Sequence, residues 1–253
     1  MLAAMPMLAA LLDLVLAPAC LGCDGRISSA DSARLICRRC RARLRPLPPP
    51  CCERCGAPLL QTGRSQHRDC DQCRAWPLAL VSARSACLLA PPADRLVHQL
   101  KYRGWHSLAP LLARCMAPHA AAIPDHEPAI CTPVPTTRAR LRRRGYNQAA
   151  LVARALAEIT GRSYAEVLAR TRASGSQTTL QPAARRANVA GAFTVAAEFA
   201  ERLTGAHVML IDDVLTTGAT AAECTRTLSA AGVCCIRLVT FARALDARRL
   251  TNN

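Results

Sequence analysis

Apolar and polar residues alternate after residue 76 in a way that favours strands and helices in turn. Four apolar runs are typical of buried strands, at 82–90, 128–134, 207–211 and 233–241. Three segments repeat apolar residues three and four positions apart, as amphipathic helices do, at 93–100, 147–160 and 219–231. Strands and helices that alternate at this length predict an α/β fold with a doubly wound, mostly parallel sheet.

The first part of the chain has a different pattern. The stretch R-P-L-P-P-P-C, from Arg45 to Cys51, is too rich in proline for a helix or a central strand and indicates a stiff spacer. The alternation of strands and helices begins only after Cys73. We therefore predict a small cysteine-rich domain at 1–75 and a larger α/β domain at 76–253.

Composition narrows the choice of partner and compartment. The formal net charge of +16 favours an anionic partner, either nucleic acid or a phosphorylated substrate, without choosing between them. No run reaches the roughly 18 apolar residues of a membrane helix. The apolar start of the chain has no basic residue before it and is interrupted by Asp13, so it favours an amphipathic helix over a signal peptide. We expect a cytoplasmic protein that does not insert into membranes.

The cysteines before residue 75 follow the spacing of zinc sites. They form four C-x-x-C pairs: Cys20 and Cys23, Cys37 and Cys40, Cys52 and Cys55, Cys70 and Cys73. A C-x-x-C turn directs two sulfurs at one point, and a second turn completes a tetrahedron around Zn²⁺. The pattern predicts two structural zinc ions, each held by two consecutive pairs. An interleaved pairing, Cys51 in place of Cys52, and a disulfide framework are the alternatives.

The segment 207–220, H-V-M-L-I-D-D-V-L-T-T-G-A-T, predicts a phosphate and ribose site. In parallel sheets, ligands bind beyond the carboxyl ends of the strands, where Asp212 and Asp213 stand. Free N–H groups at the start of the following helix attract anions. The predicted monophosphate cradle consists of Thr216, Thr217, Gly218, Ala219 and Thr220. Two carboxylates would repel a phosphate, so we expect them to accept hydrogen bonds from the 2′- and 3′-hydroxyls of a ribose.

This segment resembles the motif with which type I phosphoribosyltransferases bind 5-phosphoribosyl 1-pyrophosphate (PRPP). Other strings resemble one branch of that superfamily, the ComF family: H-Q-L-K-Y-R-G (98–104), T-P-V-P (132–135), R-R-G-Y-N-Q (143–148), Q-T-T-L (177–180) and G-A-F (191–193). That family pairs a zinc module with a phosphoribosyltransferase-type domain and is associated with the uptake of transforming single-stranded DNA. The resemblance covers the chain from about Leu12 to Arg243, and Ala184 stands where an acid is common.

The resemblance also implies roles for the basic residues. A pyrophosphate loop would follow the strand at 128–134, and the expected pyrophosphate ligands are Lys101, Arg143, Arg144 and Asn147. The segment 170–191 is similar to the mobile loop that closes over PRPP and carries Gln177 and Arg185. Mg²⁺ would accompany PRPP. Separately from the resemblance, the net charge of +16 and the five arginines between 138 and 144 predict that Arg138, Arg140 and Arg142 contact single-stranded DNA.

Two main classes of function therefore remain open, and a phosphoribosyltransferase-like regulator that does not bind DNA is a third possibility. One is a PRPP-binding protein that also binds single-stranded DNA and works with proteins of the DNA-uptake machinery. The alternative is an active phosphoribosyltransferase that passes ribose 5-phosphate to an unidentified base. No residue in the sequence stands out as a general base, so we leave open whether the protein is an enzyme.

Overall fold

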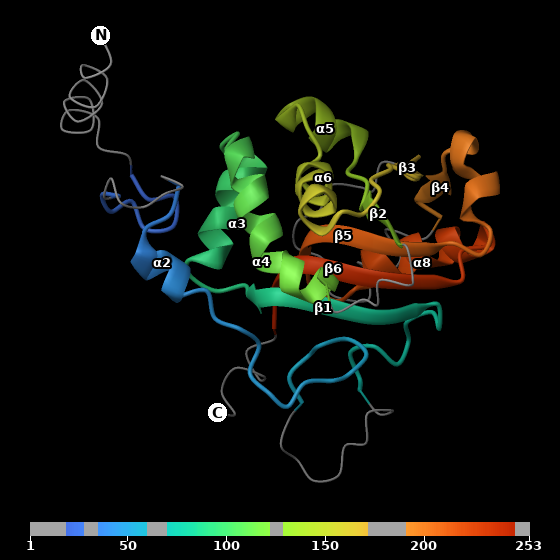
Figure 1. The fold of residues 1–253 in the computed structure, drawn as a ribbon, viewed down its shortest axis with the longest axis horizontal. Helices are drawn as coiled ribbons and strands as arrows, with labels where there is room; N and C mark the ends of the chain where they lie inside the picture. The colour runs from blue at the N-terminus through green and yellow to red at the C-terminus, as the bar shows by residue number, and fades with distance from the viewer. Residues whose placement is uncertain (1–18, 28–34, 60–69, 122–128, 172–190, 246–253) are drawn as a thin grey trace.

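A four-stranded parallel sheet forms the centre of the protein (Figure 1). We analysed a computed structural model, which describes residues 19–27, 35–59, 70–121, 129–171 and 191–245. The strands are β1 (Leu80–Leu88), β2 (Ala129–Pro133), β5 (His207–Leu215) and β6 (Cys235–Arg243), in the spatial order β1-β6-β5-β2. All three neighbouring pairs are parallel, which confirms the predicted fold class.

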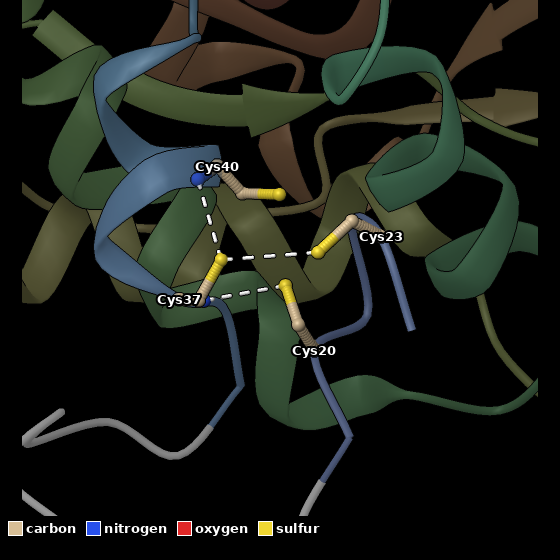
Figure 2. Close-up of side chains that lie close together, drawn as sticks. All are labelled: Cys20, Cys23, Cys37 and Cys40. Carbon is tan, nitrogen blue, oxygen red and sulfur yellow. Dashed lines mark hydrogen bonds between the residues drawn. The ribbon is translucent and has the colours of Figure 1, made fainter. Parts of the chain in front are cut away.

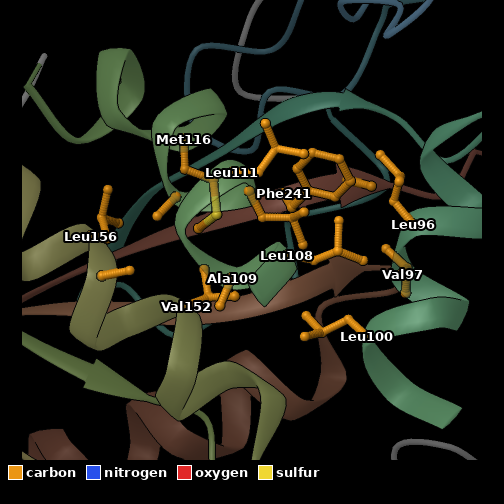
Figure 3. Close-up of a cluster of buried hydrophobic side chains, with 14 of the residues drawn as sticks. Leu96, Val97, Leu100, Leu108, Ala109, Leu111, Met116, Val152, Leu156 and Phe241 are labelled. Carbon is orange, nitrogen blue, oxygen red and sulfur yellow. The ribbon is translucent and has the colours of Figure 1, made fainter. Parts of the chain in front are cut away.

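One face of the sheet is covered by three helices. These are α3 (Ala93–Tyr102), α4 (Ala109–Ala121) and α6 (Gln148–Thr160), which lie on the same side of the sheet in Figure 1. Leu96 of α3, Met116 of α4 and Leu156 of α6 are fully buried beside Phe241 of β6, as Figure 3 shows. The amphipathic patterns at 93–100 and 147–160 therefore arise because each helix buries one stripe of side chains against the sheet.

The opposite face carries a second core. Along β5, Met209 and Ile211 belong to the first core, whereas Val208 and Leu210 belong to the second, as the alternation of side chains in a strand requires. Helix α8 (Ala219–Ala230) and the four cysteines Cys52, Cys55, Cys70 and Cys73 also belong to this second core. The second pair of C-x-x-C turns therefore covers a face of the sheet. The boundary near residue 76 stays a prediction.

Smaller elements complete the described part of the chain. They are α2 (Arg38–Ala42), η2 (His106–Leu108), α5 (Arg138–Arg144), β3 (Leu168–Arg170), β4 (Phe193–Val195), η3 (Ala197–Phe199) and η4 (Glu201–Leu203). Strands β3 and β4 pair antiparallel. No helix among the described residues is long and apolar enough to cross a membrane. The expected N-terminal amphipathic helix lies outside the described residues.

The arginine-rich segment after β2 is a helix, α5, where the sequence predicted a loop. The Thr137 hydroxyl caps the helix by accepting a hydrogen bond from the N–H of Arg140 at 3.2 Å. Gly145, with a φ of 81°, ends it in the left-handed conformation. Helix α5 projects away from the sheet, above α6 in Figure 1.

Strand β5 runs further than the predicted 207–211. Strand β2 ends with Pro133 opposite Ile211, but β6 continues beside β5 until Arg243 pairs with Leu215. The edge of β5 next to β2 is therefore left open from Asp212 onward. This difference in strand length creates the space for a site at the carboxyl end of the sheet.

Candidate functional site

A cleft of about 480 Å³ opens at the carboxyl end of the sheet. Asp212, Asp213 and Thr216 line it from the β5 side, and Lys101 lines it from α3. Arg140 and Arg144 of α5 close the side above β2. Acidic, hydroxyl-bearing and basic groups from segments distant in the sequence thus meet in one cavity, where a parallel sheet places its ligands.

The two carboxylates have different environments. Asp213 is buried and forms an ion pair with Lys101, with Nζ 2.9 Å from Oδ1. Its Oδ2 atom is also buried and has no hydrogen-bond partner among the described residues. Asp212 is partly buried, and its Oδ1 accepts a hydrogen bond from the N–H of Asp213 at 2.8 Å. Asp213 therefore has one buried carboxylate oxygen without a hydrogen-bond donor among the described residues.

Burial and the repulsion between the two carboxylates change the pKa of Asp212. Desolvation and the neighbouring charge of Asp213 raise the pKa of Asp212 to about 7, although the ammonium group of Lys101 opposes the shift. The acidic pair is thus poorly compensated when no ligand is bound. Hydroxyl donors of a ribose would supply hydrogen bonds that favour the charged form.

The loop after β5 leads directly into the start of α8. Gly218 adopts a φ of 76° and precedes the first residue of α8, Ala219, whose N–H approaches the Thr217 hydroxyl at 3.4 Å. Of the five predicted cradle residues, Thr216 and Thr220 line the cleft, whereas Thr217, Gly218 and Ala219 do not. The start of α8 and two threonine hydroxyls therefore face the same space as the two carboxylates.

The basic residues are divided between the cleft and the surface. Arg144 lines the cleft, donates to Gln148 Oε1 at 2.8 Å, and its guanidinium carbon lies 4.8 Å from the ring centre of Tyr102. Arg143 is exposed and does not line the cleft, while Arg140 does. The predicted division between pyrophosphate and DNA contacts therefore differs from the geometry at these two positions.

Asn147 and Lys101 have structural partners of their own. Asn147 caps α6 by accepting from the N–H of Ala149, and its amide donates to the carbonyl of Val134 at 3.1 Å. It lines a neighbouring cleft of about 510 Å³. Lys101 lies in the first cleft, as predicted, but pairs with Asp213. Gln177 and Arg185 lie outside the described residues.

Several lining residues were not predicted from the sequence as part of this cleft. The polar or charged side chains among them include Asp94, His98, Tyr102, Arg140, Gln148 and Arg170. His98 and Tyr102 lie one turn apart on α3, with ring centres 4.9 Å apart, and Tyr102 is 53% exposed. The i, i+4 spacing from His98 to Tyr102 places both residues on the helix face that also carries Lys101 at i+3, which is the signal that could have identified them.

The first four cysteines form a metal-binding cluster (Figure 2). The sulfurs of Cys20, Cys23, Cys37 and Cys40 all lie within 4.8 Å of one another, and those of Cys23 and Cys37 are 3.8 Å apart. A zinc–sulfur distance of about 2.3 Å gives a tetrahedron with edges of about 3.8 Å, so the set fits Zn²⁺. Burial acts to raise the pKa of Cys20, but the N–H groups of Cys37 and Gly22, together with the side chains of Cys40 and Cys23, lower this pKa to about 7.

The second cluster consists of Cys52, Cys55, Cys70 and Cys73, and it is buried. The sulfurs of Cys52 and Cys73 are 3.8 Å apart, and those of Cys55 and Cys70 are 3.7 Å apart. Cys51 is not in the cluster, because its thiol donates to the carbonyl of Pro48. Consecutive C-x-x-C pairs therefore share each site, and the donor sets are those of structural zinc.

Comparison with known proteins agrees with both parts of the chain. Residues 11–74 match a family described as a double zinc ribbon domain, and residues 141–252 match one described as a phosphoribosyl transferase domain. "DNA utilization protein YhgH" of Escherichia coli O157:H7 is 30% identical over 203 residues, which cover 77% of this chain and 84% of the relative.

A second kind of relative extends the match. "Competence protein F" of Haemophilus influenzae is 28% identical over 237 residues, which cover 89% of this chain and 96% of that protein. The double zinc ribbon, the phosphoribosyltransferase domain and identity over most of the length of both chains occur together. The chain therefore belongs to the ComF family.

Proposed function

We propose that this protein binds PRPP in the 480 Å³ cleft and acts in the handling of DNA taken up by the cell. The observation that carries the proposal is the buried, unpartnered Oδ2 of Asp213 beside the Thr216–Thr220 loop. A buried acceptor without a partner is costly, and a ribose hydroxyl would satisfy it. The 5′-phosphate of the same ribose would then lie at the start of α8.

The opposite side of the cleft suits the pyrophosphate. Arg140 and Arg144 present guanidinium groups there, and such groups pair well with phosphate oxygens. Lys101 is within reach of the same region, but it must share its charge between Asp213 and the ligand. Mg²⁺ would neutralise part of the pyrophosphate charge when bound, and its preference for oxygen ligands fits the carboxylates and phosphates of such a site.

Calorimetry with PRPP, in the presence and absence of Mg²⁺, tests this proposal. The unaltered protein should bind PRPP, and the double variant Asp212→Asn with Asp213→Asn should not. Each hydrogen bond to a charged group is worth roughly 1.5–3 kcal/mol, so the loss of two such acceptors removes most measurable affinity. Unchanged affinity in a folded, zinc-loaded double variant would contradict the assignment of the ribose.

DNA binding is the second part of the proposal. Two relatives carry names that refer to DNA utilization and to competence, and helix α5 exposes Arg138, Arg142 and Arg143. We propose that single-stranded DNA contacts this exposed face without strong sequence preference. Exposed aromatic rings are few among the described residues, so the affinity should be mainly electrostatic and should fall steeply with salt.

Catalytic transfer is an alternative to ligand binding alone. The neighbouring cleft shares Pro135, Thr136 and Arg170 with the first, so an acceptor could lie next to the bound sugar. Release of pyrophosphate from PRPP in the presence of a candidate base would establish turnover. PRPP binding without any such release would favour a role as a binding or regulatory protein.

A further inference from the structure

The side chain of Trp76 packs directly behind the loop that we propose to hold the 5′-phosphate. A methyl group added at Gly218 would lie 2.4 Å from Cζ2 of Trp76, so the indole lies against the glycine backbone. Trp76 is 7% exposed and is absent from the residues that line the cleft. It therefore contacts the loop without lining the cleft.

Trp76 is attached to the second cysteine cluster. The backbone N–H of Trp76 donates a hydrogen bond to the carbonyl of Cys73 at 3.0 Å. The guanidinium group of Arg54, which lies between Cys52 and Cys55 in the sequence, donates to the carbonyls of Cys73 at 3.0 Å, Trp76 at 3.3 Å and Pro77 at 2.6 Å. These bonds fix the backbone from Cys73 to Pro77 in one conformation.

The same cluster is connected to the other end of the loop. Arg243 of β6 is 1% exposed, and its guanidinium donates to the carbonyl of Cys55. Arg243 pairs with Leu215 in the sheet, and Leu215 immediately precedes Thr216. The second cluster thus contacts the loop near its start through Arg243 and at Gly218 through Trp76.

The first cluster has different neighbours. Asp24, in its first turn, forms an ion pair with Arg95 of α3 at 2.6 Å. A methyl group added at Gly22 would lie 3.0 Å from Pro92, the residue before α3. The contacts through Trp76 and Arg243 connect the second cluster to the Thr216–Thr220 loop, whereas these contacts of the first cluster are with α3 and the residue before it. The two cysteine clusters therefore differ in their relation to the loop.

We propose that Trp76 is a positioning residue for the phosphate loop, and that zinc in the second cluster sets the loop for binding through it. This inference rests on the proposed PRPP site. Zinc fixes the turn that carries Cys73, the turn fixes the indole, and the indole limits the positions that Gly218 can adopt. Phosphate recognition and the metal site are then one structural unit.

Ribose 5-phosphate and pyrophosphate, each titrated into the zinc-loaded full chain, test the proposal. The chain has two tryptophans, so the Trp105→Phe variant leaves Trp76 as the only one. Its emission should change on addition of ribose 5-phosphate and saturate with the affinity found by calorimetry. Trp105 does not line the cleft, so this variant should bind both ligands as the unaltered protein does.

Replacement of Trp76 then gives the decisive comparison. Trp76→Ala should weaken ribose 5-phosphate binding about tenfold, equivalent to about 1.4 kcal/mol, and leave pyrophosphate binding and the zinc content unchanged. Trp76→Phe, which keeps a ring behind Gly218, should recover most of the affinity. The proposal fails if Trp76→Ala binds ribose 5-phosphate normally, or if Trp76 emission is insensitive to that ligand. If the unaltered protein binds neither PRPP nor ribose 5-phosphate, it is the proposed function that fails.

Discussion

Asp212 should make the ligand-free protein less stable at neutral pH than a variant without its charge. Its pKa of about 7 exceeds the ordinary value of 3.8 because the folded protein desolvates it and places Asp213 beside it. The folded state therefore binds a proton more tightly than the unfolded state does. The stability that protonation provides is fully present below pH 3.8 and is lost as the pH rises to 7.

The size of this effect on the free energy of unfolding follows from the difference in pKa. The change from 3.8 to about 7 corresponds to on the order of 4 kcal/mol, and partial exposure of Asp212 reduces it to roughly 2–3 kcal/mol. In Asp212→Asn, the amide oxygen can still accept the hydrogen bond from the N–H of Asp213. The variant should therefore be more stable than the unaltered protein at pH 8, with a melting temperature roughly 4–12 °C higher.

Thermal unfolding of the zinc-loaded proteins between pH 4.5 and 8 measures the effect. The advantage of Asp212→Asn should be small at pH 4.5, grow up to pH 7 and then level off. Asp213→Asn is the matched control, because it removes the partner of Lys101 and should not stabilise the protein to the same extent. Equal stability of Asp212→Asn and the unaltered protein at pH 8 would refute the argument that this pair is electrostatically strained.

Three further predictions follow from the site and the clusters. Reduced protein prepared anaerobically with zinc should carry two zinc ions, and the finding of disulfides without metal would contradict this. Lys101→Met should lower stability at pH 8 by about 3 kcal/mol because it leaves Asp213 buried without its counter-ion, whereas Lys101→Arg should retain most of it. Replacing Arg138 and Arg142 with Ala should flatten the log–log salt dependence of single-stranded DNA binding by about 1.4, at about 0.7 for each phosphate that is no longer neutralised. Replacing the exposed Arg114 and Arg202, on α4 and η4, should leave this slope unchanged, and an unchanged slope in the α5 variant would exclude this face as the DNA site.

Short sequence motifs were enough to predict those features of the candidate site that lie within one short segment. The two acids, the phosphate loop and the C-x-x-C pairs each lie within a few residues, so their geometry follows from one turn or one strand end. The parallel sheet was predicted for the same reason, since each strand and helix shows its own period. Helix α4 was not predicted, although Ala109, Leu112, Ala113, Met116 and Ala120 are buried at helical spacing. Three of these five residues are alanine, so the buried stripe contrasts only weakly with the rest of the helix.

Some predicted site residues have other partners or positions in the structure than the sequence indicated, mostly because these depend on contacts between distant segments. Asn147 lies just before a strongly periodic helix, so its role as an N-cap could have been predicted. Arg140 lines the cleft and Arg143 does not, although the two residues are three apart in α5, so helical spacing alone could not have separated them. The contact between Trp76 and Gly218 joins segments about 140 residues apart, and no local pattern predicts it.

The bond from Arg243 to the carbonyl of Cys55 spans 188 residues of sequence, and this separation has a consequence for synthesis. A ribosome makes the second cysteine cluster early and strand β6 near the end, so the thiols are complete long before the sheet that buries them exists. During that interval, zinc bound by the four sulfurs would protect them from oxidation and from wrong pairing. Zinc supply during translation, more than zinc affinity of the finished protein, should therefore set the yield of correctly folded chains.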